Sequence, residues 1–233
     1  MKINTLTSIL TLISAGLLAH SATAAEVDVK ITNLTQGLHF TPFLVAAHTD
    51  SEYMYKLGMA ASDELQMMAE GGDISGLSGL LTSADKVENP AAGLLAPGMS
   101  TTAMLSTDAA NTELSIVSML LPTNDGFVGL NSWTIPSEAG TYTIYLNGYD
   151  AGTEANDEII NGGGAPGTPG IPADPSGNNG TGATGVTDME MTQVVHVHRG
   201  ALGDNDAAAG HSDLNSSVHR WLNPVAKVTV TVK

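Results

Sequence analysis

The strongest constraint on the folding of this chain is its excess of carboxylates. Its 233 residues include 24 Asp and Glu against 8 Lys and Arg, which gives a formal net charge of −16. This charge excludes sequence-independent nucleic-acid binding, because such binding takes its energy from Lys and Arg that neutralise phosphates. Repulsion among so many acids also opposes a compact state. The fold must therefore solvate most of these acids or bind cations with them.

The absence of cysteine removes several other possibilities. Disulfides, thiolate zinc sites and thiol nucleophiles are all excluded. Apolar residues make up 42% of the sequence, which is enough to build a hydrophobic core. Besides that core, bound divalent cations are the device by which such a chain can gain rigidity, since they also relieve repulsion between carboxylates.

Residues 1–24 have the pattern of a secretory signal peptide. Lys2 precedes an apolar stretch over residues 6–19, and Ala22-Thr23-Ala24 is a small-x-small cleavage site. No later apolar run approaches the roughly 20 residues of a membrane-spanning helix. We therefore expect an exported protein, periplasmic or extracellular, without a transmembrane segment. Its single domain is expected to span residues 25–233.

Period-two alternation of apolar and polar residues predicts β-strands in several places. It occurs over Val27–Ile31, Tyr142–Leu146 and Val228–Val232, while Leu114–Leu121 is almost continuously apolar and predicts a strand buried on both faces. Met191–His198 predicts a further strand, with Val195 and Val197 on one face and Val194, His196 and His198 on the other. Strands at both ends of residues 25–233 favour a closed, all-β sandwich.

Three short segments predict helix, and one predicts a loop. Ser62 or Asp63 is a suitable N-cap for a helix that Gly71-Gly72 would end, a second short helix follows Asp73, and Tyr53–Leu57 suggests a helical turn. Residues 161–185 contain 13 Gly or Pro in 25 positions, which predicts a flexible, exposed loop insertion that buries no surface.

Two acidic turns are candidates for calcium binding. In residues 150–158, five of nine side chains carry a carboxylate or amide oxygen, and Ca²⁺ binds six to eight such hard ligands. A second turn, Asn124-Asp125-Gly126, follows the buried strand Leu114–Leu121. If the two turns end adjacent strands, their oxygens converge at one edge of the sandwich. A pair of plain solvated turns would have the same composition.

These two turns carry a resemblance to a known family. Asn124–Gly129, followed by Tyr149–Glu154, resembles the signature of the spondin N-terminal domain, in which a D-W-F-V-G-type turn precedes a Y-D-A-G-T-D-type loop. The resemblance covers about residues 27–158, and more weakly residues 194–233. Other matching segments are Ile31–Thr35, Phe40–Phe43, Ala69–Asp73, Ala96–Gly98 and Ser118–Pro122.

The resemblance implies a C2-like antiparallel β-sandwich that binds calcium at one end and acts in extracellular adhesion. It makes Asp125, Asp150 and Glu154 the candidate calcium ligands, and Asp157 in the same loop joins them. Two features depart from the animal proteins: Gly126 replaces their Trp, and their cysteines are missing. We therefore expect an exported, calcium-binding, non-catalytic binding, adhesion or matrix module with an extracellular or cell-surface ligand.

Two other kinds of function remain open at this stage. His196 and His198 stand two residues apart on one predicted strand, so both could bind copper or zinc, with His48, His211 or His219 as a third ligand. The alternative is a polar strand face with no metal. The same acidic edge could also serve a hydrolase through paired carboxylates.

Overall fold

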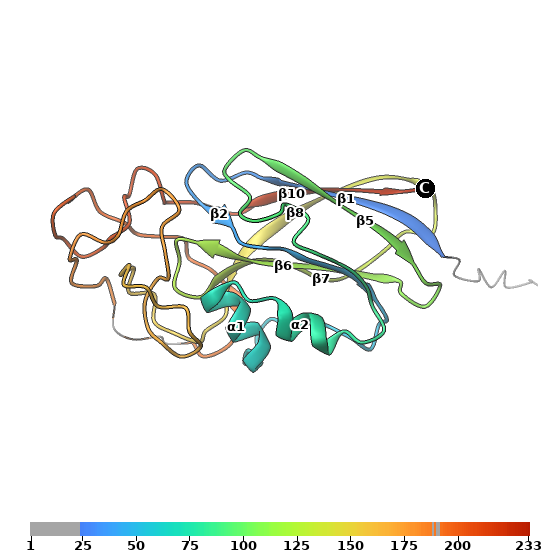
Figure 1. Ribbon diagram of the computed structural model, residues 1–233, viewed down its shortest axis with the longest axis horizontal. Helices are drawn as coiled ribbons and strands as arrows, with labels where there is room; N and C mark the ends of the chain where they lie inside the picture. Colours follow the sequence, from blue (N-terminus) through green and yellow to red (C-terminus); the bar gives the residue numbers. More distant parts are fainter. Residues whose placement is uncertain (1–23, 188, 190–191) are drawn as a thin grey trace, which may run out of the picture.

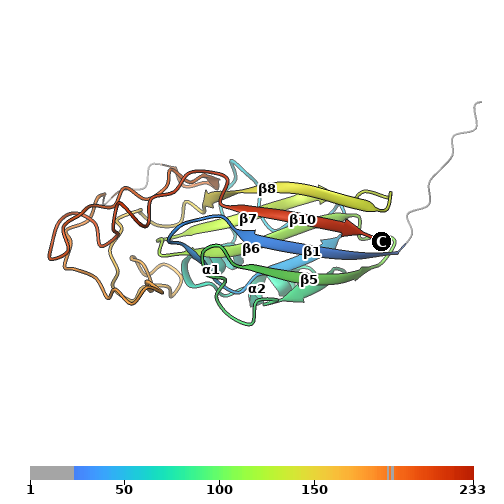
Figure 2. The same ribbon diagram turned by 90° about the horizontal axis from the view of Figure 1, so that it is seen from above.

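The computed structural model describes residues 24–187, 189 and 192–233. The predicted signal peptide lies outside these residues, except for Ala24. In the described part of the chain, the strands form two antiparallel layers that β8 (Gly140–Asp150) joins, so that the sheet is nearly closed. The prediction of an all-β antiparallel sandwich is confirmed (Figures 1 and 2).

Each layer brings together strands from distant parts of the sequence, and the second layer also pairs consecutive strands. One layer has the order β5 (Ser100–Thr107), β1 (Ala25–Asn33), β10 (Ala226–Val232) and the first part of β8. The other has the order β4 (Asp85–Glu88), β3 (Leu44–His48), β6 (Glu113–Leu121), β7 (Gly126–Thr134) and the last residues of β8. Two short strands, β2 (His39–Phe40) and β9 (His196–Val197), pair with β6 and β8.

The alternating segments place their apolar side chains between the two layers. Val27, Val29 and Ile31 of β1 are fully buried, whereas Asp28 and Lys30 between them face outward. The strand β6 is buried along nearly its whole length, as its continuous apolar pattern predicts. The β-branched residues favour this pleated, half-buried backbone.

Two helices cover the outer face of the layer that contains β6 and β7 (Figure 1). The helix α1 (Asp63–Gly71) begins after Ser62, whose Oγ accepts a hydrogen bond from the Leu65 amide, and ends at Gly72 in the left-handed conformation. The short helix α2 (Ser75–Leu80) follows. The predicted helical turn at Tyr53–Leu57 is wrong: this segment is an irregular loop.

The described residues between 151 and 225 project from one end of the sandwich (Figures 1 and 2), and we call them the loop lobe. Within its described residues, β9 is the only strand. The prediction that residues 161–185 bury no surface is wrong, because Ile171 is fully buried and packs with Ile160, Ala201 and Leu214. Buried carboxylates, described below, make this burial possible by binding the backbone amides of the loops.

The predicted strand Met191–His198 is reduced to the two residues of β9, and Met191 lies outside the described residues. Val195 is buried whereas Val197 is 52% exposed. The prediction that these two side chains lie on one face of a strand is therefore wrong. The reason is that only His196 and Val197 find strand partners, Asp150 and Tyr149, while the Val195 amide instead donates to Met59 O. No helix in the described residues is long and apolar enough to cross a membrane.

A substitution at a close contact between β8 and the loop lobe tests this arrangement. A Cβ at Gly148 would lie 2.5 Å from Cη2 of the buried Trp221. We therefore expect Gly148→Ala to lower the free energy of unfolding by about 1–3 kcal/mol, because the indole has to move. Urea denaturation measures this change. Gly79→Ala is the matched control: its Cβ meets nothing within 4 Å, and we expect no loss of stability.

Candidate metal centre

The two acidic turns meet where the sandwich joins the loop lobe. Asp125 immediately precedes β7, and Asp150 is the last residue of β8. The two strands pair there, with Gly126 opposite Asp150, and the Ala151 amide donates to the carbonyl of Asp125. The expected convergence of the two turns at one edge of the sandwich is therefore present in the structure.

Asp125 is a fully buried carboxylate with one oxygen bound and one unbound. Its Oδ2 accepts hydrogen bonds from the Thr153 amide (2.8 Å), the Thr153 hydroxyl (3.2 Å) and the Glu154 amide (3.3 Å). Its Oδ1 is buried and has no hydrogen-bond partner in the described part of the chain. Burial, and then the nearby negative charge of Asp150, raise the pKa of Asp125 to about 7.

Asp150 lies beside Asp125 and is equally buried. Its Oδ1 accepts from the Gly152 amide (2.8 Å) and its Oδ2 from the Asn156 side chain (2.7 Å). His196 Nδ1 lies 3.8 Å from Asp150 Oδ1. Asp150 is thus held in place by the same loop that it begins.

Glu154 repeats the pattern of Asp125. Its Oε2 accepts from the Gly170 amide at 2.8 Å, whereas its Oε1 is buried without a hydrogen-bond partner among the described residues. Burial is the largest cause that raises the pKa of Glu154 to about 8, and the negative charges of Glu70, Asp125 and Asp157 add to it. The amide bond from Gly170 acts in the opposite direction. Two neighbouring carboxylates therefore each present an unsatisfied oxygen.

Asp157 is half-buried at the edge of this group. Its Oδ1 accepts from the Asn124 side chain (2.8 Å) and from the Ile159 amide (3.0 Å). Both Glu154 and Asp157 line a cavity of about 790 Å³ that opens between the 150–158 loop and the rest of the loop lobe. Solvent and small ions can therefore approach the edge of this group, although Glu154 Oε1 itself is buried.

Sequence reasoning missed one member of this group, Glu70. It is the penultimate residue of α1, is fully buried, and accepts hydrogen bonds from the Gln66 side chain (2.7 Å) and the Gly167 amide (2.6 Å). An acid in the last turn of a helix is opposed by the helix dipole. That unfavourable position is the signal in the sequence that could have identified it.

The two histidines of the transition-metal alternative play different roles. His198 Nδ1 accepts a hydrogen bond from the Gly200 amide, and burial lowers the pKa of His198 to about 3, so the proton of its neutral ring is on Nε2. Neither nitrogen then offers a free lone pair to a metal. His196 Nδ1 bonds the Val194 carbonyl, which leaves only Nε2 of this residue for a metal.

Apart from His196 Nε2, the donors at this junction are oxygens, which suits a hard cation such as Ca²⁺. Among the described residues, no group of three or more His, Asp or Glu side chains is arranged so that it could hold a metal ion. The observation that fits a bound cation is the pair of unsatisfied oxygens on Asp125 and Glu154. The paired acids Asp125 and Asp150 do not line the 790 Å³ cavity, so a substrate in it would not contact the pair.

The raised pKa values predict how stability depends on pH in the absence of metal. Between about pH 4 and pH 8 the native state retains protons on Asp125 and Glu154 that the unfolded chain has lost. The free energy of unfolding should therefore fall as pH rises through this range, by about 2–4 kcal/mol from Asp125 alone. Calorimetric melting in EDTA between pH 5 and 8 measures this fall.

The variant Asp125→Asn removes the titrating group at nearly constant size. We expect it to flatten the fall in melting temperature and to raise stability at pH 8 relative to the natural chain. Asp50→Asn, at an exposed position, is the control and should keep the full slope. An unchanged slope in Asp125→Asn would contradict the assignment of the buried proton.

Comparison with known proteins identifies a family for this chain. The family model described as Spondin_N matches residues 31–159, which is more than half of the chain and includes both acidic turns. No curated protein matches the chain significantly. On the strength of the family match and the all-β fold, this chain belongs to the spondin N-terminal domain family.

Proposed function

We propose that this protein is an exported, calcium-binding and non-catalytic module that attaches to an extracellular or cell-surface ligand. The observation that carries the proposal is the pair of buried, unsatisfied oxygens, Asp125 Oδ1 and Glu154 Oε1. An unpaired polar atom inside a protein costs free energy, and an ionised one costs more. A bound divalent cation would remove that cost for both carboxylates.

Calcium fits this junction better than a transition metal does. Asp125 and Glu154 would hold the ion, with Asp150 and Asp157 as the neighbouring carboxylates that the family resemblance and the loop sequence favour. Ca²⁺ also accepts amide, carbonyl and water oxygens, and Asn124 and Asn156 lie at the same junction. When bound, the ion would supply positive charge to a region in which acids outnumber basic side chains.

The ion would have a structural consequence beyond the neutralisation of charge. Glu154 holds the Gly170 amide, and Asp125 holds the start of the 150–158 loop, so the same carboxylates fasten the loop lobe to the sandwich. With their charge neutralised, the loops around the 790 Å³ cavity would be held more firmly. That loop surface is our candidate for contact with a partner, because family membership indicates an extracellular type of module.

A calcium titration tests this proposal. Ca²⁺ at about 100 times its Kd should raise the free energy of unfolding at pH 7.5 by about 2.7 kcal/mol. For a chain of this size the melting temperature should rise by roughly 5–10 °C, and EDTA should reverse the change. Asp125→Asn and Glu154→Gln should lose the response, whereas the control Asp50→Asn should retain it.

The same experiment separates calcium from the two alternatives. Zn²⁺ or Cu²⁺ that stabilised the protein in place of Ca²⁺, with the effect lost in His196→Ala, would replace the calcium proposal with a transition-metal carrier. A melting temperature indifferent to Ca²⁺ and EDTA would overturn calcium binding. Hydrolysis of an added substrate that disappeared in Asp157→Asn would overturn the non-catalytic assignment.

A further inference from the structure

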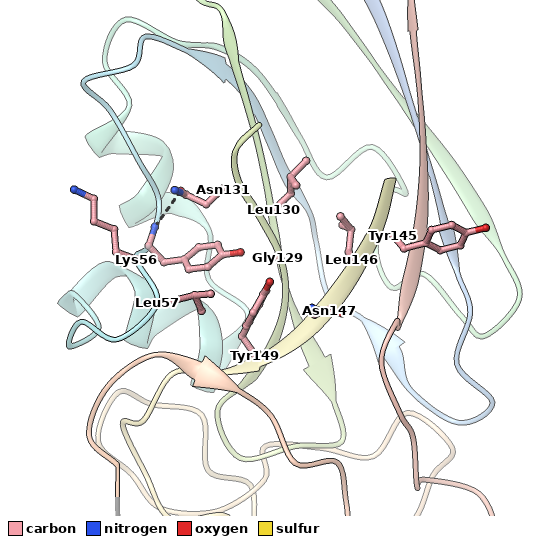
Figure 3. A pocket seen from close by; sticks show the side chains of 10 residues that line it. Lys56, Leu57, Gly129, Leu130, Asn131, Tyr145, Leu146, Asn147 and Tyr149 are labelled. Carbon is pink, nitrogen blue, oxygen red and sulfur yellow. Dashed lines mark hydrogen bonds between the residues drawn. The ribbon is translucent and has the colours of Figure 1, made fainter. Parts of the chain in front are cut away.

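A second cavity lies away from the acidic junction, on the outer side of β7 and β8. It has a volume of about 360 Å³, within the range of small-molecule sites, and none of the candidate calcium ligands lines it. Figure 3 shows it between the 53–59 segment and the two strands. The lining residues used below are Tyr55, Leu57, Gly129, Asn131, Asn147 and Tyr149.

One wall of this cavity is aromatic and rigid. The ring of Tyr55 lies 5.1 Å from that of Phe127 and 5.4 Å from that of Tyr149, measured between centroids. Only glycine fits at position 129, because a Cβ there would lie 2.6 Å from the Tyr55 hydroxyl oxygen. Asn131 Oδ1 accepts from the amides of Met54 (3.0 Å) and Tyr55 (3.4 Å), which fixes the loop to β7 (Figure 3).

Apart from Lys56, the polar groups of this cavity are neutral. Burial, assisted by the neighbouring Tyr149 hydroxyl, raises the pKa of Tyr55 far above its usual value, so its hydroxyl stays protonated. Asn147 and Tyr149 project from the same face of β8, and Figure 3 shows Tyr149 between Leu57 and Asn147. The Asn147 side-chain amide has no hydrogen-bond partner within residues 24–187, 189 and 192–233.

Charge narrows the choice of ligand further. No Asp or Glu lines this cavity, although the chain contains 24 of them, so a cation would gain no ion pair here. An anion would be repelled by the net charge of −16. The charged residue of the lining, Lys56, has its ammonium 3.7 Å from the centroid of Tyr53, and Figure 3 shows it directed away from the cavity.

We propose that this cavity binds one neutral sugar residue, either as a free monosaccharide or at the end of a glycan. The apolar face of a pyranose ring would pack on Tyr149 and Leu57, and its hydroxyls would bond the Asn147 amide and the Tyr149 hydroxyl. Side chains that combine a flat apolar surface with a polar tip suit such a ligand. This inference goes beyond calcium binding and does not depend on it.

Titration of the full chain, with side-chain amide resonances observed by NMR, tests the inference. The probes are glucose, galactose, mannose and N-acetylglucosamine, each as the free sugar and as the terminal residue of a short oligosaccharide. We expect saturable binding of at least one probe with a Kd in the millimolar range or tighter, and a shift of the Asn147 side-chain amide signal. Tighter binding of the oligosaccharide would identify a glycan end as the ligand, and equal binding would identify the free sugar.

Two variants locate the binding in this cavity. Asn147→Ala and Tyr149→Phe should each weaken the affinity about threefold to tenfold, because each removes one or two neutral hydrogen bonds. Their matched controls, Asn179→Ala in the loop lobe and Tyr142→Phe on the other part of β8, should bind like the natural chain. Melting temperatures measured alongside show whether each variant is folded.

Three results would overturn the inference. The first is the absence of saturable binding for every probe up to about 50 mM, well above a Kd of about 1 mM. The second is binding that shifts resonances elsewhere and leaves the Asn147 amide unmoved. The third is equal loss of affinity in the variants and their controls. The NMR shift requires no variant, so a misfolded Tyr149→Phe would still leave the inference open to refutation.

Discussion

The burial of carboxylates without buried Lys or Arg partners is the interaction on which this structure depends. Among the described residues, seven Asp and Glu side chains are buried and no Lys or Arg is. These acids are Glu70, Asp125, Asp150, Glu154, Glu158, Asp174 and Asp213. Burial of a charge is costly unless hydrogen bonds, protons or cations compensate for it. Hydrogen bonds compensate the acids of the loop lobe, whereas protons, or the cation proposed above, are needed at Asp125 and Glu154.

Hydrogen bonds from backbone amides compensate the acids deep in the loop lobe. Glu158 accepts from the Leu202 and Gly203 amides and from Ser212, and Asp213 accepts from the Ile160 and Thr181 amides. Loops that are poor in strands leave their amides unpaired, and these two carboxylates bind them. The acids therefore organise a Gly- and Pro-rich segment around its own small core. At Asp125 and Glu154 the amides satisfy one oxygen of each, and the other oxygen is left for a proton or a cation.

The sequence predicted the elements whose signal is local, and it failed where the contacts are distant. The alternation in Val27–Ile31 and the turns at Asp125 and Asp150 were sufficient to place strands and to predict that the acids converge. The folded arrangement of residues 161–185 could not be foreseen, because the carboxylates that hold it lie up to 97 positions away in the sequence. For the same reason Glu70 escaped notice, and so did the gathering of Tyr55, Phe127 and Tyr149, three of only ten aromatic residues, around one cavity.

The central claim is that the acids at this junction exchange protons for a divalent cation. Isothermal titration of Ca²⁺ into the metal-free protein at pH 7, repeated in buffers of different ionisation enthalpy, counts the protons released per ion. Because Asp125 and Glu154 have pKa values of about 7 and about 8, we predict the release of about one proton or more for each Ca²⁺ bound. Calcium binding without proton release, or no binding at all, would contradict this account.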